Sequence, residues 1–241
     1  MIELQNLSCF YEKESILQNI THKFPTHLSI LGANGSGKST LAKALCNLIA
    51  YSGKILLDNK EIDTYKAKER AKKIAYIPTK LEFYDEFLRV DEFILLGRFA
   101  HKENFFNYTT QDREVTKNTI KLLGIEQLQQ QTLSSLSSGE MALVLIAQAL
   151  TQESQIIIFD EPTANLDPKN AKIIASYIKQ LKKTHTIVLI THDLHLAHFI
   201  DNEVLFLKEK RAYYFQKDFF TDTNLTQLYE VPIKSLAVQY D

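Results

Sequence analysis

The stretch Gly32-Ala33-Asn34-Gly35-Ser36-Gly37-Lys38-Ser39-Thr40 decides how the fold of this chain is interpreted. It fits the phosphate-binding pattern G-x-x-x-x-G-K-[ST], the P-loop, with one further hydroxyl residue behind it. Three of the seven glycines of the chain lie here and allow a tight bend in which backbone N–H groups surround an anion. Lys38 adds a positive charge that can reach the outer phosphates, and Ser39 offers a hydroxyl to Mg²⁺.

The residues on both sides of the stretch support this interpretation. Residues 28–31 are an apolar run that predicts a short strand, and residues 41–49 repeat leucine and isoleucine at helical spacing. A P-loop needs a strand before it and a helix after it, whose N-terminal dipole points at the phosphates. The alternative, a glycine-rich surface turn, needs neither element. We therefore expect nucleotide binding by Gly32, Asn34, Gly35, Ser36, Gly37, Lys38, Ser39 and Thr40.

A pair of carboxylates follows the most apolar strand of the sequence. Residues 156–159 are all apolar and end at Asp160 and Glu161, which predicts a central parallel strand with charges at its carboxyl end. In a P-loop protein Asp160 is the expected Mg²⁺ partner, and Glu161 is expected to position and polarise the attacking water. The alternative is a pair of carboxylates in solvent at a strand end.

A second buried strand, residues 186–190, ends at Thr191-His192-Asp193 and places His192 at the same edge as Glu161. His192, His195 and His198 could indicate a metal site. Steps of three drift around a helix, however, and no cysteine or carboxylate ligand accompanies them. We interpret His192 as functional and the other two as surface residues.

The N-terminal residues predict a strand with an aromatic side chain at its end. Residues 2–7 alternate apolar and polar, which is typical of a half-buried edge strand. Tyr11 follows directly before a charged turn. Its ring could stack on a nucleotide base or pack against the end of the strand, and the sequence leaves both possibilities open.

Between the strand at residues 74–77 and the strand at 156–159 the sequence becomes helical. Residues 90–97 and 115–123 predict helices, the second stopped by Gly124. Residues 134–140 are rich in serine and precede an apolar helix at 141–150, as either an ordinary N-cap or a second phosphate-binding helix start. We expect one α/β domain over 1–241, with a core of 1–80 and 151–241 and a helical insertion at about 81–150.

Composition restricts where the protein acts. The 241 residues carry 28 basic and 29 acidic side chains, a net charge of −1, so no global field attracts nucleic acid. The two cysteines form no disulfide framework, no signal peptide is recognisable, and the longest apolar stretch is too short to span a bilayer. We expect an intracellular protein that reaches a membrane only through a partner.

Taken together and in order, these motifs resemble the ATP-binding subunit of an ABC transporter over essentially the whole chain. They are the P-loop, the Leu-Ser-Ser-Gly-Glu stretch at residues 136–140, the strand with its two carboxylates, Ala-Asn-Leu-Asp and Thr-His-Asp. The resemblance implies an α/β fold: a RecA-like P-loop NTPase core with an antiparallel β subdomain and an inserted helical subdomain. It also implies ATP hydrolysis with Mg²⁺.

The resemblance assigns roles to further residues. In this family two copies sandwich two nucleotides head to tail, and the signature contacts the γ-phosphate of ATP bound to the opposite subunit. Tyr11 becomes the residue that stacks on adenine, Asp167 the residue that crosses the dimer interface, and His192 the γ-phosphate switch. The signature residues carried over are Ser137, Ser138, Gly139 and Glu140.

A narrower likeness concerns the transported substrate. Residues 90–101 and the closing Leu-Tyr-Glu-Val-Pro at 228–232 are similar to importers of iron–siderophore complexes, haem and cobalamin. This implies a homodimer on the cytoplasmic face of the plasma membrane. Its partners would be a polytopic permease and, indirectly, a substrate-binding protein, with no nucleic acid.

The sequence departs from the family at positions that matter for hydrolysis. Thr79 stands where the family has a glutamine that touches Mg²⁺ and water; its hydroxyl can serve as a metal contact, but the side chain is shorter. Ser138 replaces the first glycine of the signature, and residues 141–143 and Gln148 replace positions that usually include arginine. Two alternatives follow: a weakly hydrolysing subunit paired with a competent one, or an ABC protein acting as a nucleotide-gated clamp on nucleic acid or a ribosome.

Overall fold

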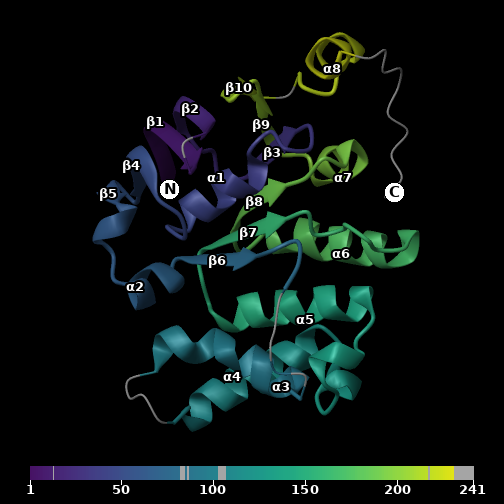
Figure 1. Ribbon diagram of the computed structural model, residues 1–241. Coiled ribbons are helices and arrows are strands. Elements are labelled where there is room, and N and C mark those ends of the chain that lie inside the picture. The colour runs from purple at the N-terminus through teal and green to yellow at the C-terminus, as the bar shows by residue number, and fades with distance from the viewer. Residues whose placement is uncertain (13, 82–84, 86, 103–106, 217, 231–241) are drawn as a thin grey trace.

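The larger of two β-sheets forms the centre of the protein (Figure 1). The computed structural model describes residues 1–12, 14–81, 85, 87–102, 107–216 and 218–230. The six strands run in the order β10-β9-β3-β8-β7-β6, and all neighbours are parallel except β9 and β10. Their bounds are β3 Leu28–Gly32, β6 Ile74–Ile77, β7 Ile156–Asp160, β8 Thr186–Ile190, β9 Glu203–Lys208 and β10 Arg211–Phe215.

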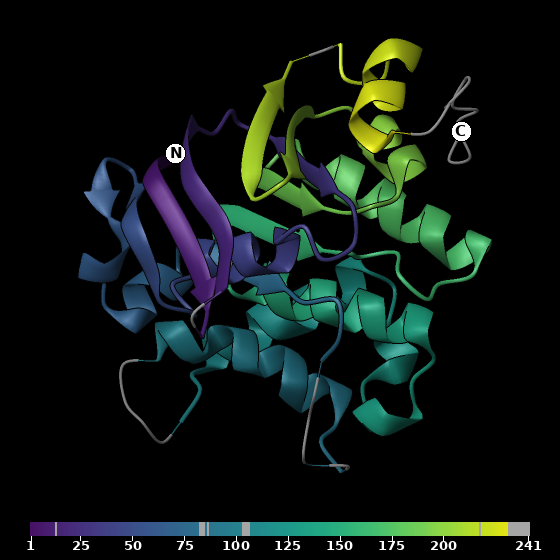
Figure 2. The same cartoon turned by 45° about the horizontal axis from the view of Figure 1, so that its top comes forward.

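The second sheet is antiparallel, in the order β2-β1-β4-β5. Its strands are β1 Ile2–Tyr11, β2 Glu14–Lys23, β4 Tyr51–Leu57 and β5 Lys60–Glu61. The prediction that residues 2–7 form an edge strand was wrong, because β1 pairs with β2 on one side and with β4 on the other. The alternation of apolar and polar residues reflects a sheet with one buried face, not a position at its edge. Figure 2 shows these strands in purple and blue, with β10 next to β2.

The apolar runs of the parallel strands are explained by burial on both faces of the large sheet. Along β7, Ile157 and Phe159 pack against the helices on one face, and Ile156 and Ile158 pack into the core between the two sheets. A parallel sheet covered on both faces needs such continuous apolar strands. In the described chain, the α-helices outside the region between β6 and β7 are α1 Lys38–Leu45, α2 Ala67–Ala71, α6 Pro168–Leu181, α7 Leu194–Ile200 and α8 Asp222–Tyr229, and a 3₁₀ helix spans Ile62–Thr64.

Between β6 and β7 the described chain is helical, as expected. It forms α3 Val90–Leu95 with a 3₁₀ helix at Leu96–His101, α4 Thr110–Leu122 and α5 Ser138–Thr151, with short 3₁₀ turns at Glu126–Leu128 and Leu133–Ser135. The apolar α5 lies between the sheet and the other two helices (Figure 1), which is why it is apolar around most of its circumference.

A buried ion-pair network fastens these helices to one another. The guanidinium of Arg98 donates to Asp112 Oδ1 at 3.0 Å, to the carbonyl of Thr151 at 2.8 Å and to Glu153 at 2.6 Å. Next to it, a Cβ on Gly97 would lie 2.3 Å from the carbonyl oxygen of Gln148, so the 3₁₀ helix approaches α5 too closely for any side chain. Residues 97 and 98 therefore hold α3, α4 and α5 together.

Replacing Arg98 with methionine should destabilise the protein by about 3 kcal/mol in urea unfolding at neutral pH, because the Asp112 carboxylate loses its buried partner. Burial alone would raise the pKa of Asp112, but hydrogen bonds from Thr109 and Arg98 outweigh it and lower that pKa. The carboxylate therefore stabilises the native fold at neutral pH, and this contribution is lost as pH falls through the lowered pKa. The difference in the free energy of unfolding between wild type and variant should therefore become smaller at acidic pH. Lys117 is an exposed cation of α4, the helix that carries Asp112. A similar loss of stability in Lys117→Met would contradict this account.

Candidate nucleotide-binding site

The P-loop connects β3 to α1 as a loop that only glycine-rich sequence can form. Gly35 and Gly37 adopt φ angles of 81° and 97°, in the left-handed region that other residues avoid. Gly37 is also the N-cap of α1, which begins at Lys38 rather than at residue 41. Backbone N–H groups at the start of this helix are thus directed toward the loop that would hold phosphate.

Lys38 is buried and bonded to the loop itself. Its ammonium donates to the carbonyls of Gly32 at 2.9 Å and Ala33 at 3.1 Å, and lies 3.8 Å from Glu161 Oε1. Burial lowers its pKa, and the neighbouring Glu161 and Asp160 carboxylates oppose that effect. The Lys38 ammonium is therefore held by hydrogen bonds to two carbonyl oxygens, and phosphate oxygens could replace these partners.

Asp160 lies at the carboxyl end of β7, where the sequence predicted it, and is 1% exposed. Ser39 donates to its Oδ1 at 3.1 Å, and the Tyr76 hydroxyl donates to its Oδ2 at 2.9 Å. Burial raises the pKa of Asp160, while these two hydrogen bonds lower it in part. Burial and the Asp160 carboxylate also raise the pKa of Tyr76, so its hydroxyl keeps the proton it donates.

Glu161 is held in a strained conformation by the last residue of β8 and the two residues after it. Its φ angle is 52°, an unusual value for a residue other than glycine, and its N–H donates to the Ile190 carbonyl at 2.8 Å. Its Oε2 accepts from the Thr191 hydroxyl at 3.2 Å and from the His192 N–H at 3.3 Å, and lies 2.9 Å from His192 Nδ1. The structure thus brings Lys38, Asp160, Glu161 and His192 together at one edge of the sheet.

The exposure of Tyr11, His195 and His198 can be compared with what the sequence led us to expect. The Tyr11 ring is 73% exposed at the end of β1, so it does not pack against the strand end. His195 and His198, expected to be surface residues, are half-buried. The cause is the packing of α7, which places the His198 ring edge-on against the Phe220 ring, with 4.9 Å between the ring centroids. No group of three or more potential ligands that could hold a metal ion occurs among the described residues.

The signature residues form the first turn of α5. Ser137 is its N-cap, and Glu140 accepts from the Ser137 N–H at 2.9 Å and from its hydroxyl at 2.6 Å. These hydrogen bonds lower the pKa of Glu140. Ser137 and Ser138 are exposed, whereas Gly139 is buried against Asn170 of α6, where a Cβ would lie 2.6 Å from the amide carbon. The stretch thus caps α5 and leaves Ser137 and Ser138 on the surface.

Asp167 caps the neighbouring helix α6. Its Oδ1 accepts from the N–H groups of Lys169 at 2.9 Å and Asn170 at 3.1 Å, and its Oδ2 accepts from the Asn170 amide at 2.5 Å. Hydrogen bonds, first of all from Asn170, lower the pKa of Asp167. Asn170 therefore contacts both the cap of α6 and the signature glycine.

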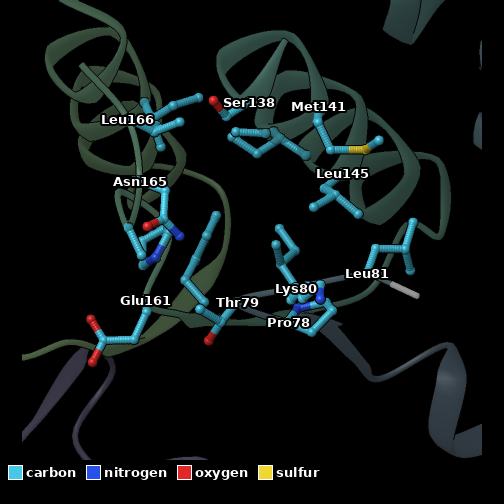
Figure 3. A pocket seen from close by; sticks show the side chains of 17 residues that line it. Pro78, Thr79, Lys80, Leu81, Ser138, Met141, Leu145, Glu161, Asn165 and Leu166 are labelled. Carbon is cyan, nitrogen blue, oxygen red and sulfur yellow. The ribbon is translucent and has the colours of Figure 1, made fainter. Parts of the chain in front are cut away.

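Thr79 and Ser138 face the same pocket. The pocket is about 180 Å³ in volume and lies between the loop after β6, the start of α5 and the loop after β7. In Figure 3 the Glu161 carboxylate points away from the other labelled side chains, with Thr79 between it and Pro78. The apolar side of the pocket is formed by Leu81, Met141 and Leu145.

Two residues of the site were not assigned roles from the sequence. Tyr76 and Thr191 each donate a hydrogen bond to a carboxylate of the Asp160–Glu161 pair. Thr191 directly follows a buried strand, a position that could have indicated it. Tyr76 lies within β6, where its pattern is that of an ordinary strand residue.

Comparison with known proteins identifies the family. The model of the family described as ABC transporter matches residues 18–164, more than half of the chain. An uncharacterised ABC transporter ATP-binding protein of Methanocaldococcus jannaschii is 35% identical over 218 residues, which cover 88% of this chain and 84% of the relative. The manganese transport system ATP-binding protein of Halalkalibacterium halodurans is 32% identical, covering 95% and 92%. A probable iron chelatin transport ATP-binding protein of Helicobacter pylori is 33% identical, covering 98% and 95%.

Solved structures agree on the fold. An ABC transporter assigned to the metal-chelate type, in an inward-facing conformation, superposes with a TM-score of 0.83 at 28% identity, covering 96% of this chain and 89% of the other. A dimeric ATP-binding cassette in a post-hydrolysis state with ADP and Pi superposes with a TM-score of 0.78 at 25% identity, covering 91% and 100%. The expected fold class is confirmed. The chain belongs to the ATP-binding proteins of the ABC transporter family and is an ATPase.

Proposed function

We propose that this ATPase works as a dimer of identical subunits, binds ATP with Mg²⁺ at the site described, and energises import through a separate membrane permease. The observation that supports the proposal most is the convergence of Lys38, Asp160 and Glu161 beyond the carboxyl ends of the parallel strands β3 and β7. Ligands of open α/β sheets bind at this edge. The names of the relatives favour transport over the alternative of a clamp on nucleic acid.

The residues present fit a magnesium ion. Mg²⁺ prefers oxygen ligands such as carboxylates and hydroxyls, and Ser39 and Asp160 place one of each within 3.1 Å of each other. When bound, the ion would neutralise charge that develops on the phosphates. Thr79 is exposed beside this edge, and its role as a metal contact stays a prediction.

The chain's own groups would then act on the nucleotide in separate ways. The N–H groups of residues 32–40 would bind the phosphates, and Lys38 would exchange two carbonyls for phosphate oxygens. Glu161 would orient water and accept its proton, with Thr191 and His192 holding its Oε2. Tyr11, exposed at the end of β1, would stack on the base.

Replacing Glu161 with glutamine should lower ATP turnover at least about a hundredfold while ATP still binds, because glutamine keeps the shape and loses the base. The Thr191 hydroxyl and the His192 N–H can still donate to the amide oxygen. Phosphate release and retention of labelled ATP measure the two effects, with Glu126→Gln, an exposed carboxylate, as control. Wild-type turnover in Glu161→Gln would remove Glu161 from its assigned role.

We infer that the second copy completes each nucleotide site. The exposed Ser137 and Ser138 and the α6 cap at Asp167 are the groups that would face the partner subunit's ATP. The dimeric relative with ADP and Pi supports this arrangement. Ser138 adds a side chain at that contact between the subunits. The residue at position 138 would therefore affect the rate at which the dimer hydrolyses ATP.

Thr79 should limit the coupled rate. Thr79 is exposed and lines a pocket together with Glu161 and Ser138, so a longer side chain can be accommodated at this position. Thr79→Gln should therefore raise, or at least preserve, ATPase activity in the assembled transporter. The measurement is ATP turnover of the complex with its permease. A large loss of activity would show that the site is built around threonine.

The permease would dock on the side of α3–α5. We propose that residues 81–150 form a helical subdomain within a single domain of residues 1–241. The pocket between the Thr79 loop and α5 offers an apolar wall, and Phe99 is 47% exposed on the same helical block. Phe105 and Phe106 of the same segment lie outside the described residues. None of the helices in the described chain has the length and apolar character needed to span a bilayer.

The substrate we propose is a metal chelate, foremost an iron complex, handed over by a substrate-binding protein on the other side of the membrane. Residues 90–101 and relatives named for manganese, iron chelatin and petrobactin transport support it. The ATPase would be peripheral on the cytoplasmic face of the plasma membrane.

Cells carrying Lys38→Ala should take up less labelled iron chelate, haem or cobalamin than cells carrying the wild type, since the variant binds phosphate poorly. Lys43→Ala, an exposed lysine of the same helix α1, is the matched control and should transport normally. If none of the three solutes depends on Lys38 and another solute does, the chelate assignment is wrong while import survives.

A further inference from the structure

Tyr76 reaches from one strand to the carboxylate of the next. It lies on β6, the edge strand of the large sheet, in register with Ile158 of β7. Its half-buried ring packs against the core between the two sheets. From there its hydroxyl donates to Asp160 Oδ2 at 2.9 Å. This contact joins residues 84 positions apart in the chain and does not involve the P-loop.

The hydrogen bond occupies the second oxygen of a carboxylate whose first oxygen faces the P-loop. Oδ1 of Asp160 accepts from Ser39 of α1, and Oδ2 accepts from Tyr76 of β6. Because the two donors come from different elements, the carboxylate cannot rotate without losing one of them. The plane of the Asp160 carboxylate is thus set by α1 and β6 together, without a ligand.

We propose that Tyr76 is a positioning residue for the metal site: it fixes Asp160 in the orientation that Mg²⁺ binding requires. This rests on the proposed function, in which Ser39 and Asp160 bind the ion. Groups that orient a metal ligand from behind contribute to metal affinity even though they never touch the ion. Tyr76 also links β6 to Asp160, the proposed metal ligand. Thr79, the short side chain beside the site, follows Tyr76 by three residues.

A purely structural hydroxyl would behave differently. Such a group would contribute to the stability of the fold and leave the affinity for the ion unchanged. Tyr65 provides a matched example, because its hydroxyl donates to the Leu57 carbonyl at 2.9 Å and its ring packs against the same core. Replacing either tyrosine with phenylalanine keeps the ring and removes one hydrogen bond, and the two hydrogen bonds are equal in length.

The test compares Tyr76→Phe, Tyr65→Phe and wild type by the binding of a fluorescent, non-hydrolysable ATP analogue, in EDTA and over a series of Mg²⁺ concentrations. In Tyr76→Phe the Mg²⁺ concentration that gives half of the metal-dependent gain in nucleotide affinity should rise about tenfold. Its affinity in EDTA should stay within about twofold of wild type, because the hydroxyl does not contact the nucleotide cradle. Tyr65→Phe should match wild type in both conditions. Urea unfolding of all three proteins verifies that they are folded.

An unchanged Mg²⁺ requirement in Tyr76→Phe would overturn the positioning role, as would an equal shift in Tyr65→Phe. Asp160→Asn tests the underlying metal site separately. If that variant also responds to Mg²⁺ like wild type, the ion does not bind at Asp160 and both proposals fall. If Asp160→Asn loses the response and Tyr76→Phe keeps it, the metal site stands and only the positioning role is wrong.

Discussion

The structure depends on keeping three charged side chains close together where strands end. Lys38 and Asp160 are buried and the Glu161 side chain is 13% exposed, and charges withdrawn from water are costly unless they are paired and hydrogen-bonded. Every one of them is satisfied inside the chain: Lys38 by carbonyls of the P-loop, Asp160 by two hydroxyls, Glu161 by Thr191 and His192. The parallel sheet is the element that makes this possible. Because β7 and β8 run in the same direction, the polar residues that follow them lie at the same end of the sheet.

These contacts also indicate what a nucleotide must replace. Carbonyl oxygens are weaker partners for an ammonium than phosphate oxygens are, so Lys38 gains by leaving them. Its departure removes the nearest cation from Glu161 Oε1, 3.8 Å away. Glu161 would then be held only through its other oxygen, which leaves Oε1 open to water. In the proposed mechanism, ATP binding and preparation of the base would both follow from this movement of Lys38.

The sequence predicted well whatever is written in short, local patterns. The strands that carry the P-loop, Asp160 and His192 are apolar runs followed at once by their polar residues, and each was placed within a residue or two. Contacts between distant residues were beyond reach. The central position of β1, the partial burial of His195 and His198, and the Tyr76–Asp160 hydrogen bond all depend on which elements become neighbours. Residues 90–101 give a further example: the pattern suggested a substrate class, and in the structure Gly97 and Arg98 hold the helices against α5.

The central claim is that the buried Lys38 ammonium is held in place for phosphate. The most direct test is the equilibrium affinity for ATP of wild type, Lys38→Ala and Lys43→Ala, measured by calorimetry. Loss of a charged hydrogen-bond donor should weaken binding about tenfold to a hundredfold in Lys38→Ala. Lys43→Ala, on the exposed side of the same helix, should bind as wild type does. Equal affinities for all three proteins would contradict the account.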